Sequence, residues 1–125
     1  MGGTASVVTS DDGAQGAAGA VLVDEARVAL LRRDPAEWAE ILALYRQYAA
    51  ELLAAIEQDV GRGAPALVVR HVHQLKGCSA NMGLIAAAAR CAELEERLRK
   101  ASPTNLDELV AGLREIVERS AAALG

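Results

Sequence analysis

From residue 21 onward, apolar residues recur at spacings of three and four, which is the period of an α-helix that buries one face. No stretch shows sustained alternation of apolar and polar residues, so we predict no strands. The longest apolar stripe consists of Trp38, Ile41, Leu42, Tyr45, Tyr48, Leu52, Leu53, Ile56 and Val60. Three shorter stripes follow it and are expected to face the core: Leu67, Val68, Val72, Leu75 and Cys78; then Leu84, Ala88, Cys91, Leu94 and Leu98; then Leu106, Leu109, Val110, Leu113, Ile116, Val117 and Leu124. The pattern therefore predicts an all-α protein.

Capping and turn residues divide this pattern into separate helices. Asp34 and Pro35 are typical of a helix start, because Asp can cap the helix and Pro suits its first position. Glycine, proline and asparagine interrupt the pattern near residues 61–65, 81–83 and 102–105. We predict a short helix within residues 21–33, followed by longer helices over about 34–60, 65–80, 84–100 and 106–124.

The predicted helices are joined by short breaks, which favours antiparallel packing of sequential helices. We therefore expect an antiparallel up-down four-helix bundle with a short additional N-terminal helix packed across one end. Residues 1–20 are rich in small and polar residues, and we interpret them as a disordered N-terminal tail that precedes a bundle domain over residues 21–125. Residues 1–6 formally fit a myristoylation pattern, the alternative being a flexible leader.

Composition narrows the choice of partners. Only 2% of the 125 residues are aromatic, so the core must consist of Leu, Val, Ile and Ala, of which Leu and Ala are strong helix formers. The net charge is −4 and no basic stripe is present, which argues against a nucleic acid partner. No apolar run is long enough to cross a membrane. Two cysteines form no disulfide framework, which favours a cytoplasmic protein, and we expect a monomer.

The candidate chemistry lies in the helix predicted over residues 65–80. If Val72 and Leu75 point to the core, His73 points away from it, with Lys76 and Gly77 on its face. A neutral imidazole is a good nucleophile near pH 7. A lysine one turn away can stabilise an acquired phosphoryl group, and a glycine leaves room for a second protein. The alternative is a surface histidine without a role, beside a glycine that permits close helix packing.

The segment from His73 to Gly83 resembles the signature of histidine-containing phosphotransfer (HPt) domains, which is His-x-x-Lys-Gly followed by small residues and a further glycine. The resemblance extends from about residue 21 to the C-terminus. It implies that His73 is phosphorylated, that Lys76 holds the phosphoryl oxygens and that Gly77 gives the partner access. The supporting positions that it implies are Gln74, Ser79, Asn81 and Gly83. The family's usual Ser or Ala after the first glycine is Cys78 in this chain.

Glu95 departs from the family pattern. Several family members have a glutamine at the matching position of the next helix, where it hydrogen-bonds the imidazole. A carboxylate there could accept from the ring N–H and orient the other nitrogen for attack. It would also repel a bound phosphoryl group. The alternative is that Glu95 is an exposed helix charge without a role in the site.

The resemblance implies a phosphocarrier of a two-component phosphorelay that shuttles a phosphoryl group between His73 and aspartates of response-regulator receiver domains. The chain has no Gly-rich phosphate loop, so we expect no kinase activity of its own. It needs no cofactor, because Mg²⁺ would belong to the receiver. The other partner would be a hybrid sensor histidine kinase. We expect partners to dock around His73, on apolar residues exposed beside the helices predicted over 65–80 and 84–100.

The alternatives to a phosphocarrier are a metal-binding protein, an inactive adaptor bundle and the phosphoacceptor module of a histidine kinase. His71, His73, Cys78 and Cys91 offer metal ligands, but the two histidines diverge by about 200° on one helix and cannot easily chelate one ion. An inactive adaptor bundle would not need both His73 and Lys76. The dimerising phosphoacceptor module of histidine kinases has an acidic residue after its histidine, where this chain has Gln74.

Overall fold

A computed structural model describes residues 21–101 and 103–125, and every regular element in that part of the chain is a helix. The predicted tail over residues 1–20, with its myristoylation pattern, lies outside the described residues. The helices are α2 (Glu25–Leu31), α3 (Pro35–Gly61), α4 (Pro65–Asn81), α5 (Ile85–Lys100) and α6 (Leu106–Ala123).

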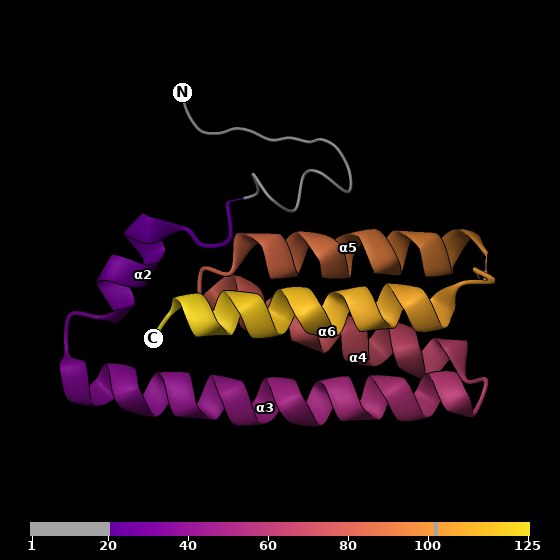
Figure 1. Ribbon diagram of the computed structural model, residues 1–125, viewed down its shortest axis with the longest axis horizontal. Coiled ribbons are helices and arrows are strands. Elements are labelled where there is room, and N and C mark those ends of the chain that lie inside the picture. The colour runs from indigo at the N-terminus through magenta and orange to yellow at the C-terminus, as the bar shows by residue number, and fades with distance from the viewer. Residues whose placement is uncertain (1–20, 102) are drawn as a thin grey trace.

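The four long helices form an up-down bundle, which confirms the predicted fold class (Figure 1). Helices α3 and α5 run in one direction, and α4 and α6 run in the other. Each long helix packs against two neighbours, so that α4 lies between α3 and α5, and α6 closes the bundle against α5 and α3. The short helix α2 lies at one end of the bundle, as predicted.

The start of α3 and the end of α4 follow the local signals in the sequence. Asp34 Oδ1 accepts hydrogen bonds from the backbone N–H groups of Ala36 and Glu37. At the end of α4, Gly83 has a φ of +77°, and an added Cβ would lie 3.1 Å from Arg27 Cγ. Only glycine suits a left-handed conformation with so little space beside it.

Hydrogen bonds join the turn after α4 to the segment around α2. The Gly83 carbonyl accepts from the Asp24 backbone N–H at 2.7 Å, and the Asn81 carbonyl accepts from Arg27 Nε at 2.9 Å. Arg32 donates to the Leu124 carbonyl at 2.6 Å, which ties the same segment to the end of α6. Helix α2 therefore fixes the end of the bundle where α4 turns into α5.

The core contains the aliphatic residues that the sequence predicts, among them Leu53, Ile56, Val72, Leu75, Leu84 and Leu113. Two predicted core positions are wrong. Tyr48 is 43% exposed and Leu67 is 38% exposed, because the adjacent residues Ala49 and Val68 occupy the inward positions. Adjacent residues differ by about 100° around a helix, and at these two positions packing turns one member of the pair inward and the other outward.

None of the described helices is both long enough and apolar enough to cross a bilayer.

Candidate functional site

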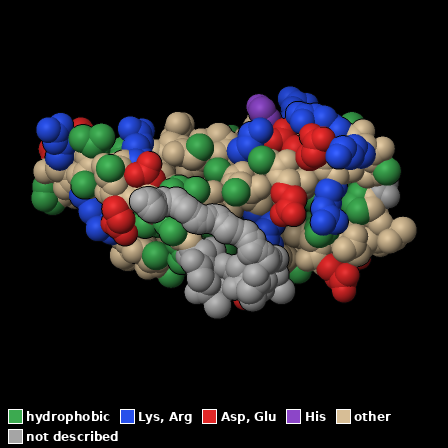
Figure 2. Space-filling view, turned by 90° about the horizontal axis from the view of Figure 1, so that it is seen from above, with side chains coloured by type: hydrophobic (Ala, Val, Ile, Leu, Met, Phe, Trp, Pro, Cys, Tyr) green, Lys and Arg blue, Asp and Glu red, His purple; other side chains and the backbone are tan. Residues whose placement is uncertain are grey.

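His73 stands on the outer face of α4, near the middle of the bundle. Its neighbours on the helix, Val72 and Leu75, are completely buried, whereas the His73 side chain is 65% exposed. The apolar pattern of α4 thus determines this orientation, because burying Val72 and Leu75 turns the two intervening residues, His73 and Gln74, outward. Figure 2 shows a histidine that protrudes from the surface beside a group of Lys and Arg side chains.

Glu95 reaches His73 from the neighbouring helix α5. Its Oε2 lies 2.9 Å from His73 Nδ1, and its side chain is only 2% exposed. Glu95 follows the buried Cys91 by one helical turn and therefore faces α4. The alternative prediction of an exposed helix charge at Glu95 is wrong.

The same carboxylate pairs with Lys76. Lys76 Nζ lies 2.5 Å from Glu95 Oε1. The contact is an ion pair between a partly exposed ammonium group and a buried carboxylate. Burial raises the pKa of Glu95, but the contacts with Lys76 and His73 outweigh burial, and the net result is a pKa below the ordinary value. Glu95 is therefore ionised at neutral pH.

The ionised carboxylate determines which nitrogen of His73 carries the proton. A carboxylate can only accept hydrogen bonds, so Nδ1 must be the donor to Glu95 Oε2. In neutral His73 the lone pair is then on Nε2, the ring nitrogen that does not contact Glu95. The arrangement provides an exposed imidazole with one nitrogen held and the other available as a nucleophile.

Arg99 is a member of the cluster that sequence reasoning missed. Its Nη2 lies 3.5 Å from Glu95 Oε2, the oxygen that also accepts from His73. The signal in the sequence is the spacing of four residues between Glu95 and Arg99, which places both on one face of α5. That spacing became informative only once Glu95 was placed beside His73.

The glycine beside the cluster packs against no other helix in the described part of the chain. An added Cβ at Gly77 would meet no atom within 4 Å, and the residue is exposed. The alternative explanation for this glycine was close packing against another helix. No other described helix lies close enough to Gly77 for that explanation to apply. Gln74 is also exposed on this side of α4.

The remaining supporting positions lie away from the imidazole and shape the end of α4. Ser79 is buried, with its Oγ 2.9 Å from the Tyr45 hydroxyl, and burial raises the pKa of Tyr45 to about 12. Asn81 and Gly83 bind the segment around α2 through their carbonyls. These residues position α4, and none of their contacts reaches His73.

The two histidines of α4 point to opposite sides of the helix. His71 Nδ1 lies 2.7 Å from Asp59 Oδ2 of α3, whereas His73 binds Glu95 of α5. Cys91 is buried and Cys78 is half-buried, and both are free thiols. Within residues 21–101 and 103–125, no group of three or more His, Cys, Asp or Glu side chains is arranged to hold a metal ion.

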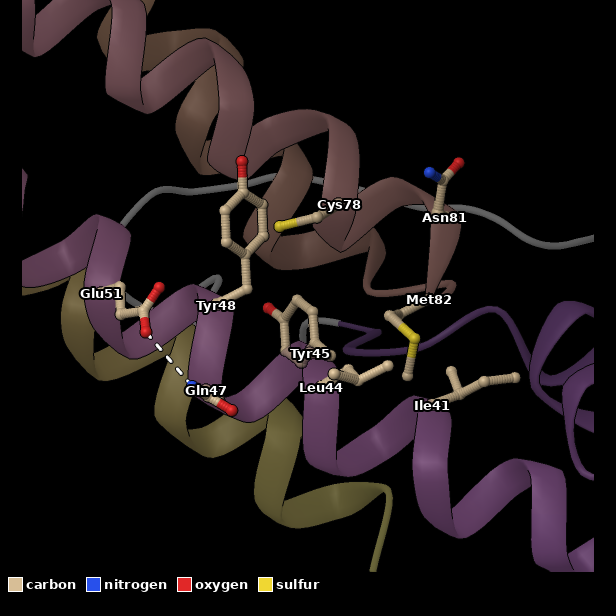
Figure 3. Close-up of a pocket in the computed structure, with 9 residues that line it drawn as sticks. All are labelled: Ile41, Leu44, Tyr45, Gln47, Tyr48, Glu51, Cys78, Asn81 and Met82. Atoms are coloured by element: carbon tan, nitrogen blue, oxygen red, sulfur yellow. Dashed lines mark hydrogen bonds between the residues drawn. The ribbon is translucent and has the colours of Figure 1, made fainter.

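An apolar groove runs between α3 and α4 (Figure 3). Its volume is about 510 Å³, and the exposed Leu44 and Tyr48 contribute apolar surface to it. Cys78, the next residue after Gly77, lies on its wall. The groove is lined by Ile41, Leu44, Tyr45, Gln47, Tyr48, Glu51, Cys78, Asn81 and Met82.

Comparison with known proteins agrees with the fold and with the motif on α4. The family model of the Hpt domain matches residues 40–123, which include the whole of α4, α5 and α6. The crystal structure of histidine-containing phosphotransfer protein B (HptB) from Pseudomonas aeruginosa PAO1 superposes with a TM-score of 0.76. The two sequences are 23% identical, and the match covers 84% of this chain and 92% of that one. This likeness shows the same fold. No curated protein matches the chain.

The match to the Hpt model covers well over half of the chain. The chain therefore belongs to the Hpt domain family and is a histidine phosphotransfer protein of a phosphorelay, a phosphocarrier and not a kinase.

Proposed function

We propose that His73 is the residue that carries the phosphoryl group, and that it exchanges this group with aspartates of receiver domains. The observation that supports the assignment is the hydrogen bond from His73 Nδ1 to the buried Glu95 carboxylate, on a ring that is 65% exposed. His71 lacks this exposure, since its side chain is 25% exposed and paired with Asp59.

In the forward reaction, the Nε2 lone pair of His73 attacks the phosphorus of an aspartyl phosphate in line with the bond that breaks. The N–P bond forms, the P–O bond to the aspartate breaks, and the electron pair leaves with the aspartate carboxylate. The Nδ1 proton stays on the ring, where Glu95 holds it. The reverse sequence delivers the phosphoryl group to a second receiver.

Lys76 would supply positive charge to the phosphoryl oxygens. In the free protein its Nζ is paired with Glu95 Oε1, one helical turn from His73. A phosphoryl group on His73 brings nearly two negative charges, which compete with Glu95 for this ammonium group. Because the Lys76 side chain is 32% exposed, it can turn from Glu95 to the phosphoryl oxygens without leaving a closed core.

The partners in this proposal are response-regulator receiver domains and a hybrid sensor histidine kinase, with the relay in the cytoplasm. The receiver would contribute Mg²⁺, and this chain would act as a monomer without a cofactor of its own. We assign docking to the surface made by Gly77 and the groove between α3 and α4. The groove thus adds α3 to the docking surface that the sequence suggested beside α4 and α5.

The test is transfer of label from a panel of ³²P-phosphorylated receiver domains to the purified chain. We expect acid-labile, alkali-stable label on the wild type, no label on His73→Gln, and normal label on the matched control His71→Gln. Label that persists in His73→Gln would place the phosphorylated residue elsewhere. A wild type that stays unlabelled by every receiver would favour the inactive adaptor.

A further inference from the structure

Among residues 21–101 and 103–125, two carboxyl groups are buried, and both bind histidines of α4. Asp59 of α3 lies 2.7 Å from His71 Nδ1, and Glu95 of α5 lies 2.9 Å from His73 Nδ1. The two histidines are two residues apart and diverge by about 200° around the helix. Helix α4, which packs between α3 and α5, is therefore held from two sides by the rings of its histidines.

The bond between Asp59 and His71 lies close to the connection between α3 and α4. The Asp59 backbone carbonyl accepts from the Ala64 N–H at 2.9 Å, just before α4 begins. Its side chain is only 5% exposed, so little water competes for the carboxylate oxygens. A carboxylate only accepts hydrogen bonds, so His71 Nδ1 is the donor. Because a buried charge without a partner is costly, this bond fixes His71 against α3.

The apolar contacts of α4 restrain its rotation less sharply than this bond does. Val68, Val72 and Leu75 are completely buried, but apolar burial favours no particular direction. Side-chain atoms lie about 5–6 Å from a helix axis, so a rotation of about 10° displaces them by about 1 Å. A shift of that size is enough to break the 2.9 Å hydrogen bond from His73 to Glu95.

A second hydrogen bond between α3 and α4 lies farther from the nucleophile. It joins Ser79 to Tyr45, six residues beyond His73, which is about 9 Å along the helix axis. His71 is only two residues away, at about 3 Å along the axis. The bond to Asp59 is thus the nearer restraint of α4 against α3.

We propose that Asp59 and His71 are positioning residues for phosphoryl transfer, because their hydrogen bond sets the rotation of α4 that directs His73. The inference rests on the proposed function of His73. The His71 ring faces α3 and cannot touch a phosphoryl group on His73, which faces α5. The pair therefore acts through the orientation of the nucleophile, and its loss should lower the maximal rate of transfer without changing the affinity for the receiver domain.

The test compares His71→Leu with the double variant Asp59→Leu/His71→Leu. The single variant leaves a buried carboxylate without its donor and should unfold at lower urea, whereas the double variant leaves no buried charge there and should regain stability. Both should transfer with a maximal rate on the order of tenfold below the wild type, since misplacing reacting atoms by about 1 Å can cost up to about a hundredfold. The receiver concentration at half-maximal rate should stay unchanged.

Two controls separate the orientation of α4 from a general loss of stability. In His71→Asn the amide nitrogen can take the place of Nδ1 and donate to Asp59, so most of the rate should return. His71→Gln also keeps a donor, which is why its labelling should be normal. Ser120 is buried on α6 and donates within that helix, to the Ile116 carbonyl at 2.6 Å. Ser120→Ala thus loses a buried hydrogen bond away from α4 and should transfer at the wild-type rate.

The ¹H–¹⁵N NMR spectrum of the His73 imidazole provides a readout that stability alone would not change. The double variant should show both tautomers of His73, and Ser120→Ala should show the Nδ1–H tautomer alone. Wild-type transfer by the double variant would overturn the inference. Slow transfer with an unchanged His73 spectrum would also overturn it, because the pair would then act by another route. In both cases His73 would still be labelled, whereas an unlabelled wild type would remove the proposed function itself.

Discussion

Glu95 places a negative charge beside His73, where a glutamine would be neutral. A glutamine at this position could hold the imidazole through its amide oxygen without adding charge. The carboxylate also holds the imidazole, but it additionally attracts Lys76 and Arg99 and repels a phosphoryl group on the other ring nitrogen. The imidazole is thus held in one orientation by a carboxylate that also contacts two cations.

Replacing Glu95 by alanine should allow the proton of neutral His73 to lie on either ring nitrogen. Because the carboxylate fixes the proton on Nδ1, the wild type should show a single tautomer in ¹H–¹⁵N NMR of the imidazole, and Glu95→Ala should show a mixture. We expect the initial rate of phosphoryl transfer to fall in proportion to the part of the ring population that then presents a protonated Nε2. A single Nδ1–H tautomer in the variant would refute this assignment.

Lys76 contributes to both folding and transfer, and the two contributions can be separated. Lys76→Met leaves the buried Glu95 with fewer partners, so we expect a folded protein that loses about 1–3 kcal/mol of unfolding free energy and transfers more slowly. The double variant Lys76→Met/Glu95→Gln should recover stability, measured by urea unfolding, because no buried charge remains.

The transfer rate of this double variant decides the role of Lys76. Since it still lacks the ammonium group, we expect its transfer to remain slow although its stability returns. Recovery of the rate together with stability would show that Lys76 serves the fold alone.

At the scale of the element, Gly77 makes α4 less stable than it could be. A glycine inside a helix costs up to ~1 kcal/mol relative to alanine, and among residues 21–101 and 103–125 nothing packs against this position. We predict that Gly77→Ala raises the unfolding free energy by about 0.5–1 kcal/mol in urea unfolding. A destabilised Gly77→Ala protein would contradict the open environment of this residue.

A larger side chain at the same position should act on the partner. Gly77→Leu should leave the helix intact and slow transfer from every receiver domain, since it fills the space beside the imidazole. The control is Ala54→Leu, an exposed position of α3, which should transfer at the wild-type rate. Transfer at that rate by Gly77→Leu would remove the proposed contact between Gly77 and the receiver.

At the scale of the whole molecule, two carboxylates link α3, α4, α5 and α6 and make stability depend on pH. Glu95 joins α5 to α4 through Lys76 and His73, and Arg114 of α6 lowers the pKa of Glu57 on α3 through hydrogen bonds of 2.6 Å and 2.9 Å. Both carboxyls have folded-state pKa values below the ordinary value of 4.5.

The direction of the pH effect follows from these lowered values. The unfolded chain binds protons at higher pH than the folded one, so the stabilisation is fully present above pH 4.5 and is lost as the pH falls through the folded pKa values. Urea unfolding between about pH 6 and pH 3 should show a steeper loss of stability for the wild type than for Glu95→Gln. Parallel curves would show that Glu95 has the same pKa in both states.

The fold could be predicted from the sequence to within a few residues at each helix end, because the signals are local. The spacing of Val72 and Leu75 turns His73 outward, Asp34 caps α3, and Gly83 permits the turn after α4. The prediction failed at Tyr48 and Leu67, where the apolar pattern is wide enough to offer two candidate inward residues and packing selects one.

The sequence by itself therefore determined the helices, their order and the exposure of His73, since each depends on residues within one or two helical turns. Only the tertiary structure decided that Glu95 is buried, that it collects Lys76, His73 and Arg99, and that His71 pairs with Asp59 instead. Apart from the pair of Glu95 and Arg99 within α5, these contacts join different helices, and the rotation of one helix against another depends on how all the side chains between them pack.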